Sequence, residues 1–349
     1  MVTFGDPNLT LARTISYELG FDHILPGDIL LQLAAFYHDI SDQQDTTRFT
    51  AVSGGYYNRI TDSQYEDIRG FELTIRKTAG RWWSGFANYT YQVSSKGHFG
   101  SQEMWEDPSE QKRYDEATVN LYQERPIPRP YARLNLSFYT PDDFGPVFIG
   151  QSVLGGWMLN TLLDWQAGQW VTWAPNLMTV ENNLKGVPYF NATLRFTKTF
   201  IMNKFRLQFI LDMENIFNTK RMCLINWSGS GDRDNYMQSL HLPKSKAYSN
   251  IPGEDRYGDY RNPNVEFQPI EFQEKIKSDD PSAAGVIYYE GSTGRYMEKV
   301  NGQWLPVDSR RMVQILQDKA YIDMPNNTSY TFLHPRQIFY GLRLSFDLN

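Results

Sequence analysis

Apolar and polar residues alternate along nine segments of this chain, and this period of two limits the possible fold more than any other feature. In residues 205–214, for example, Phe205 and Leu207 alternate with Arg206 and Gln208. Successive side chains of a β-strand point to opposite faces, so the pattern predicts strands with one apolar and one polar face. The nine segments are residues 14–24, 28–39, 69–77, 82–94, 132–138, 157–166, 190–197, 205–214 and 340–347. The sequence therefore predicts an all-β fold.

The links between these segments alternate between short and long. Residues 25–27, 78–80 and 201–204 are short links, whereas residues 40–68, 95–130, 173–189 and 218–335 are long. Residues 141–155 form a medium link with Pro and Gly, for which we expect an ordered turn and not a helix. Short turns at one rim and long loops at the other are typical of outer-membrane barrels. We therefore predict part of an antiparallel transmembrane β-barrel, with about nine or ten strands and long extracellular loops.

The composition is compatible with a barrel and excludes several other classes of protein. No apolar run reaches the ~18 residues that a membrane-spanning helix needs. Aromatic residues make up 15% of the chain, and several tryptophans lie near predicted strand ends, as expected for aromatic girdles at membrane interfaces. The net charge of −6 gives no basic surface for nucleic acid. The single cysteine, Cys223, excludes an internal disulfide framework.

The first residues do not form a secretion signal. Residues 1–7 lack both the basic and the apolar region of a signal peptide. Because an exported barrel needs such a signal, we expect the chain to lack N-terminal segments. A sheet of nine strands would be open and would expose two unpaired edges and an apolar face. We therefore expect the chain alone to aggregate or to depend on the missing segments.

Residues 218–335 are too long for a passive loop and are rich in turn-forming residues. Residues 288–296 predict a hairpin, and Asn301-Gly302 predicts a second tight turn. Residues 309–319 predict a short helix with Ser309 as its N-cap. We interpret the segment as an ordered external subdomain. The predicted organisation is barrel strands and loops over residues 1–217, the subdomain over 218–335, and a closing strand over 336–349.

The sequence contains none of the motifs that carry common enzymatic chemistry. It has no His-Glu-x-x-His metalloprotease motif, no phosphate-binding loop with Lys and no Gly-x-Ser-x-Gly elbow. The five histidines are scattered without ligand spacing. Residues 232–235 (Asp-Arg-Asp-Asn) carry oxygen ligands that suit calcium, but a solvated turn is the better interpretation. We therefore expect no catalytic residue, no cofactor and no metal site.

Charged residues of both signs lie on the polar side of the predicted strands. They are Glu72, Arg76, Arg133, Asp164, Arg195, Arg206, Asp212, Glu214 and Arg343. A mixed-charge wall suits a water-filled and plugged barrel interior, so we predict that these side chains face the lumen. There they would contact a plug or a substrate, and hydrogen bonding to a plug is the favoured role.

Four stretches resemble the TonB-dependent receptor family. They are residues 5–9 (Gly-Asp-Pro-Asn-Leu) followed by 14–20 (Thr-Ile-Ser-Tyr-Glu-Leu-Gly), residues 69–73 (Arg-Gly-Phe-Glu-Leu), residues 214–218 (Glu-Asn-Ile-Phe-Asn) and residues 341–346 (Gly-Leu-Arg-Leu-Ser-Phe). The last stretch resembles the C-terminal assembly signal of the family, carried here by Gly341, Leu344 and Phe346. Leu11 and Ala12 replace the Pro-Glu pair that is usual after the first stretch.

This resemblance implies the C-terminal part of a barrel of 22 strands with a plug. It implies a location in the outer membrane of a Gram-negative bacterium and a role in ligand uptake energised through TonB. The implied partners are outer-membrane lipid, the missing plug and barrel strands, the TonB complex through the missing part, and the barrel assembly machinery. The transported ligand stays open among siderophores, vitamins, glycans and peptides.

Two other interpretations fit the alternation. A self-contained small barrel, either a porin or an adhesin, would need its first and last strands to pair with each other. A soluble all-β binding protein would pack the apolar side chains between two stacked sheets.

Overall fold

The computed structural model divides the described residues into two compact units. It describes residues 2–118, 122–148, 150–177, 180–202, 205–222, 230–259, 266, 268–318, 330–332 and 335–346. Unit 1 comprises Met1–Ala167, Pro188–Thr219 and Leu333–Asn349, and unit 2 comprises Gly168–Val187 and Lys220–Phe332. The second unit therefore includes residues 168–187, which the sequence analysis grouped with the barrel segments.

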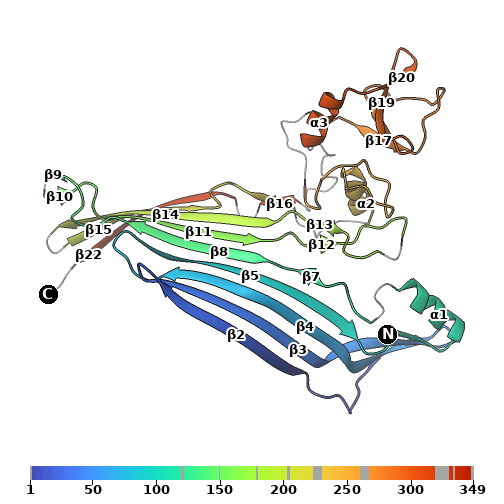
Figure 1. The fold of residues 1–349 in the computed structure, drawn as a ribbon, viewed down its shortest axis with the longest axis horizontal. Coiled ribbons are helices and arrows are strands. Elements are labelled where there is room, and N and C mark those ends of the chain that lie inside the picture. The colour runs from blue at the N-terminus through green and yellow to red at the C-terminus, as the bar shows by residue number, and fades with distance from the viewer. Residues whose placement is uncertain are drawn as a thin grey trace. The chain divides into compact units, whose positions relative to one another are not determined.

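Unit 1 is built on one antiparallel path of nine strands, which Figure 1 shows from blue β2 to red β22. The strands are β2 (Arg13–Leu25), β3 (Ile29–Thr50), β4 (Tyr56–Lys77), β5 (Trp83–His98), β8 (Tyr131–Tyr139), β11 (Trp157–Gln166), β14 (Tyr189–Met202), β15 (Phe205–Glu214) and β22 (Gln337–Phe346). Each of the nine alternating segments lies on one of these strands, and each strand pairs with the next in this order. The all-β antiparallel prediction is confirmed.

The long link predicted over residues 40–68 is wrong, because β3 and β4 continue through most of it (Figure 1). The two strands stay paired as far as Thr50 and Tyr56, with register shifts between Ile40 and Asp45. We refer to the paired outer halves of β3 and β4 as the ribbon. Two short strands pair with it in parallel, β1 (Thr3–Phe4) beside β4 and β6 (Glu103–Trp105) beside β3. Both faces of the ribbon carry polar residues, so its period of two is not visible as an apolar–polar alternation.

The short link between β2 and β3 is a tight turn. Residues 26–28 form a three-residue hairpin loop between the paired residues Leu25 and Ile29, and Gly27 and Asp28 have positive φ angles of 84° and 59°. The link over residues 201–204 includes residues 203–204, which lie outside the described part. The described residues of 141–155, which exclude residue 149, form an ordered turn as predicted, with a small hairpin of β9 (Val147–Phe148) and β10 (Gln151–Ser152) and no helix.

In its described part, the link between β5 and β8 contains β6, one helix and one further short strand. Helix α1 (Pro108–Ala117) begins after Asp107, whose side chain accepts a hydrogen bond from the backbone N–H of Ser109. Strand β7 (Ile127–Pro128) pairs with β5 just before β8 begins. None of the described helices is long and apolar enough to cross a membrane.

Strands β2 and β22 form the two ends of the sheet within the described residues. β2 pairs only with β3, and β22 pairs only with β15. The sheet is therefore open, as expected for part of a barrel. A self-contained small barrel would require β2 and β22 to pair with each other, and they do not.

Unit 2 contains both of the hydrophobic cores found in the described chain. Strands β12 (Trp170–Val171) and β13 (Leu184–Lys185) and helix α2 (Ser230–Ser239) contribute to one core, which includes Trp173, Met237 and Leu240. The second core includes Ile287 and Met312. It lies between helix α3 (Ser309–Gln317) and a sheet of β17 (Ile270–Gln273), β18 (Ile287–Glu290), β19 (Arg295–Val300) and β20 (Gln303–Pro306). A separate pair joins β16 (Lys220–Met222) to β21 (Tyr330–Phe332).

The structure confirms part of the predicted detail of this subdomain and corrects the rest. The hairpin of residues 288–296 is formed by β18 and β19, and Asn301-Gly302 is the turn between β19 and β20. Residues 232–235 do not form a solvated turn, because they lie inside helix α2. Cys223 lies outside the described residues.

Helix α3 begins at the residue that the sequence analysis took for its cap. Asp308 is the N-cap, and its Oδ2 accepts hydrogen bonds from the backbone N–H groups of Arg310 at 2.9 Å and Arg311 at 3.0 Å. Ser309 is the first helical residue. Asp and Ser are similarly good N-cap residues, so the sequence alone could not show whether Asp308 or Ser309 is the cap.

We predict that Asp308→Ala destabilises α3 by about 1 kcal/mol, because two backbone donors lose their acceptor. The matched variant Ser309→Ala should change the stability by only a few tenths of that amount. Hydrogen–deuterium exchange of the α3 amides in the full chain measures both. Equal protection in the two variants would contradict the assignment of the cap.

Candidate functional site

The strand register brings the nine predicted lumen residues to a single face of the sheet. Residues directly opposite each other on neighbouring strands share a face. Arg133 lies opposite Asn88 on one side and Asp164 on the other, and Arg195 lies opposite Asp212. Following the pairs across the sheet puts Glu72, Arg76, Arg133, Asp164, Arg195, Arg206, Asp212, Glu214 and Arg343 on this face, called here the polar face.

Two cross-strand ion pairs neutralise part of the polar face. The guanidinium of Arg133 lies 2.6 Å from the carboxylate of Asp164. Arg195 contacts Asp212 through two parallel hydrogen bonds of 2.6 and 2.8 Å. Exposed pairs of this kind contribute roughly 0.2–1 kcal/mol each, so their main effect is to cancel charge and fix side-chain positions.

Other charged residues of the polar face have no such partner. Among the described residues, Arg76, Arg206, Arg343 and Glu214 form no ion pair within 4.0 Å. Arg343 lies opposite Gln208, and Arg206 lies opposite Ser345. The two arginines are therefore diagonal neighbours of like charge on adjacent strands, available to an acidic partner.

A polar depression lies on the same face between β2 and β5, with a volume of about 280 Å³. Its lining combines two carboxylates with small and aromatic side chains, namely Glu18, Ala34, Phe36, His38, Ile68, Glu72 and Gln92. Gly70 lies opposite Phe36 beside the depression, where the neighbouring strand and the Phe36 ring leave no room for a side chain. A Cβ there would come within 2.2 Å of the carbonyl oxygen of Tyr91. Glu72 accepts only a long hydrogen bond of 3.5 Å from Thr90 Oγ1, so the site can accept a cation.

Sequence reasoning did not select Glu18 and His38 as site residues. Glu18 lies in the segment with the weakest alternation, although it belongs to the Glu-Leu-Gly motif of that strand. His38 Nδ1 lies 2.9 Å from Ser16 Oγ, and the His38 ring stacks on Phe36. Only the pairing of β2, β3 and β4 brings these residues beside Glu72.

The opposite face of the sheet is apolar, and the described residues of unit 1 form no hydrophobic core against it. Ala192 is the single buried hydrophobic residue among the described residues of unit 1. Large apolar side chains on this face are instead exposed, including Leu19 at 77% and Leu342 at 70%. A soluble sandwich would bury these side chains against a second layer, and unit 1 contains no such layer in its described part.

Cations and tryptophans meet on the apolar face near the short turns. The ammonium of Lys77 lies 5.2 Å from the ring centre of Trp83 and donates to the carbonyl oxygen of Gly27. Lys198 lies 5.2 Å from the ring centre of Trp157 and donates to backbone carbonyls of residues 152–155. Amphipathic rings with cations beside them are typical of the level where lipid headgroups begin.

The family model described as "TonB dependent receptor-like, beta-barrel" matches residues 1–216. The chain belongs to this family. No curated protein and no solved structure matches the chain. The match covers β1 to β15 and ends before the later segment of unit 2 and before β22. The open sheet of unit 1, which has one apolar and one polar face, is therefore part of a TonB-dependent receptor barrel.

Strand β22 carries the residues that resemble the C-terminal assembly signal of TonB-dependent receptors. Leu344 and Phe346 lie on the apolar face and are 53% and 57% exposed. The ring of Phe346 meets the ring of Phe205 edge to face at 5.1 Å. Gly341 lies on the polar face, opposite Ile210. Strand β22 is paired with β15 along its whole length, and the role of these residues as an assembly signal stays a prediction.

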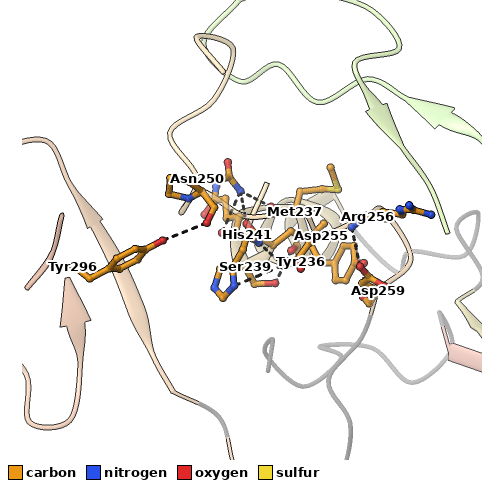
Figure 2. A network of polar contacts seen from close by, with 12 residues as sticks. Tyr236, Met237, Ser239, His241, Asn250, Asp255, Arg256, Asp259 and Tyr296 are labelled. Atoms are coloured by element: carbon orange, nitrogen blue, oxygen red, sulfur yellow. Dashed lines mark hydrogen bonds and ion pairs between the residues drawn. The ribbon is translucent and has the colours of Figure 1, made fainter. Parts of the chain in front are cut away.

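Unit 2 contains a network of polar contacts around helix α2, shown in Figure 2. Asp255 Oδ2 accepts a hydrogen bond of 2.7 Å from the backbone N–H of His241. Asn250 Nδ2 donates to the carbonyl oxygen of Met237 at 2.7 Å, and Tyr236 donates to that of Asp259 at 2.6 Å. The network joins helix α2 to the loop that follows it. Among the described residues, no group of three or more His, Cys, Asp or Glu side chains could hold a metal ion.

Burial changes the acid–base behaviour of two residues in or beside this network. Desolvation lowers the pKa of His241 from 6.5 to about 4. Burial and the neighbouring Tyr289 raise the pKa of Tyr296 to about 12, and its hydroxyl donates to the carbonyl oxygen of Pro252. The Tyr296 hydroxyl is therefore a donor at every physiological pH, and His241 is neutral above pH 6.5.

We predict that unit 2 loses stability as the pH falls from 6.5 towards 4. In this window the unfolded chain binds a proton at His241 and the folded chain does not, so the folded state loses roughly 3 kcal/mol relative to its value above pH 6.5. Hydrogen exchange of residues 230–259 at several pH values measures the effect.

The variant His241→Gln should flatten this pH dependence. The control His23→Gln, which changes an exposed histidine, should preserve it. An unchanged slope in His241→Gln would contradict the role of this residue.

Proposed function

We propose that this chain forms part of the barrel wall of an outer-membrane transporter that takes up a scarce ligand with energy supplied through TonB. The observation that carries the proposal is the strand register, which separates a continuous polar face from a continuous apolar face. A sheet of this kind suits hydrocarbon on one side and a water-filled interior on the other. Membership in the family supports the same function.

In this proposal the short turns lie in the periplasm, and the ribbon of β3 and β4 lies outside the cell. Hydrocarbon offers no hydrogen-bond partners, so the free edges of β2 and β22 pair with further strands of the barrel. The polar face contacts a plug, whose cationic groups suit the depression with Glu18 and Glu72. The acidic groups of the plug or of the ligand suit Arg206 and Arg343. The TonB complex acts through the plug, and the assembly machinery acts on β22.

Two adjacent leucines in the middle of β11 test which face meets the lipid. Leu163 lies on the apolar face opposite Leu134, and Leu162 lies on the polar face opposite Asn135. Leu163→Arg should cost about 2–4 kcal/mol near the middle of the bilayer, whereas Leu162→Arg should cost little. The amount of protease-resistant protein in outer-membrane fractions measures both. Equal losses in the two variants would contradict the assignment of the faces.

Transport itself is tested by comparing two deletion strains. A strain without this gene and a strain without TonB should both fail to deplete the same solute from a defined medium, and the intact gene should restore depletion only where TonB is present. Mass spectrometry of the spent medium identifies the solute. Depletion that depends on this gene but not on TonB would replace the proposal with a passive pore.

A further inference from the structure

A groove crosses the middle of the apolar face, where small residues of β5 and β8 lie between larger ones. It has a volume of about 350 Å³ and is lined almost entirely by apolar side chains. Ala87 lies between Ile75 and Leu134 on the neighbouring strands, and Ala132 lies opposite Trp165. All five residues line this space. We refer to it as the apolar groove.

A lysine lies at the end of the apolar groove that is closer to the short turns. Lys77 follows Ile75 by two residues on the same face of β4 and lies opposite Gly85. Its ammonium donates to the carbonyl oxygen of Gly27 and lies 5.2 Å from the ring centre of Trp83. It forms no ion pair within 4.0 Å with any described residue. Because an ammonium has three N–H donors, it can donate to a further acceptor.

The apolar groove and Lys77 together have the length of one membrane leaflet. Leu73 lines the groove and lies four residues before Lys77 on β4. At roughly 3.3 Å per residue, this separation is about 13 Å along the strand. The apolar band of an outer-membrane barrel is about 25 Å tall, and cations beside tryptophans mark its boundary. The groove therefore extends from the headgroup level at Lys77 towards the middle of the band.

The charges around Lys77 favour an anionic head group. Its neighbours on the apolar face, Ile75, Gly85 and Trp83, are uncharged. Asp28, the acidic residue of the turn between β2 and β3, is exposed to water. A cation at the edge of the hydrocarbon attracts the phosphate groups of lipids. A ligand that fits both features has a phosphate at one end and a long apolar chain at the other.

We propose that the apolar groove and Lys77 bind one phospholipid molecule of the periplasmic leaflet. The lipid phosphate accepts hydrogen bonds from the Lys77 ammonium, and one acyl chain lies along the groove over Ala87 and Ala132. An acyl chain has no hydrogen-bonding group, so it suits a lining that offers almost none, whereas an extended peptide does not. This inference rests on the proposed function, which puts the apolar face in lipid and the short turns in the periplasm. It adds one specifically bound lipid to the barrel wall.

The test is native mass spectrometry of the receptor extracted from outer membranes into detergent micelles, titrated with dipalmitoyl phosphatidylglycerol. We expect saturable binding of one molecule. Dipalmitoylglycerol, which has the same chains without the phosphate, should bind roughly fivefold more weakly, because it has no group for the Lys77 ammonium.

Matched variants separate the headgroup contact from the chain contact. Lys77→Gln should weaken binding roughly fivefold, and Lys77→Arg should retain it. The control Arg69→Gln removes a cation from the same face of β4, nearer the long loops, and should leave the affinity unchanged. Ala132→Leu fills the groove and should weaken binding roughly threefold. The control Ala35→Leu adds the same bulk to the apolar face outside the groove and should not weaken binding.

Four outcomes would overturn the inference. They are lipid uptake that does not saturate, equal binding of dipalmitoylglycerol, a loss in Arg69→Gln as large as that in Lys77→Gln, and equal losses in Ala132→Leu and Ala35→Leu. A loss confined to Arg69→Gln would assign the lipid to the outer leaflet. The amount of each variant in outer-membrane fractions shows whether the barrel still assembles, and Ala87→Leu replaces Ala132→Leu if the latter does not. If TonB-dependent depletion of a solute continues while no phospholipid binds, the transport function stands and only the lipid site is wrong.

Discussion

The absence of hydrogen-bond partners in hydrocarbon is the constraint on which the rest of unit 1 depends. A chain that crosses lipid must pair its backbone groups within the sheet, so only side chains can differ between the two surfaces. Because side chains alternate, one slip of register would turn a strand's charges into the lipid. The register puts Arg133 opposite Asp164 and Arg195 opposite Asp212, with all four residues on one face of the sheet. The same register leaves Leu134, Leu163 and Leu194 on the other side.

Some charged residues of the polar face are neutralised by ion pairs within the sheet, and others are not. The ion pairs Arg133–Asp164 and Arg195–Asp212 cancel their own charge at the middle of the sheet. Glu18 and Glu72 share a depression, and near the end of the sheet Arg206 and Arg343 are diagonal neighbours with no acidic partner among the described residues. Uncompensated charges are costly in a confined space, so these are the positions at which a complementary partner gains most.

The two units solve the problem of burying apolar surface in different ways. Unit 1 buries a single hydrophobic residue among its described residues, and lipid replaces the core that a soluble domain would build. Unit 2 builds two cores of its own and pays for its buried His241 and Asp255 with short backbone hydrogen bonds. The ribbon of β3 and β4 combines features of both units. It is paired like a membrane strand, yet it carries Thr, Arg and Asp on both faces, as a sheet in water does.

The sequence by itself determined the nine strands, because lipid on one face and water on the other impose a visible period of two. It also determined the shared face of the nine charged residues, since parity along each strand fixes the face once pairing is sequential. Only the tertiary structure decided the rest. The outer halves of β3 and β4 carry no apolar–polar alternation, so the sequence did not predict that they pair. The structure shows this pairing, with β1 and β6 as further strands at the two edges. Glu18 and His38 became site residues only through pairing across three strands. Residues 168–187 joined a unit more than thirty residues later in the chain, because burial of Trp173 and Leu184 depends on contacts that no local pattern encodes.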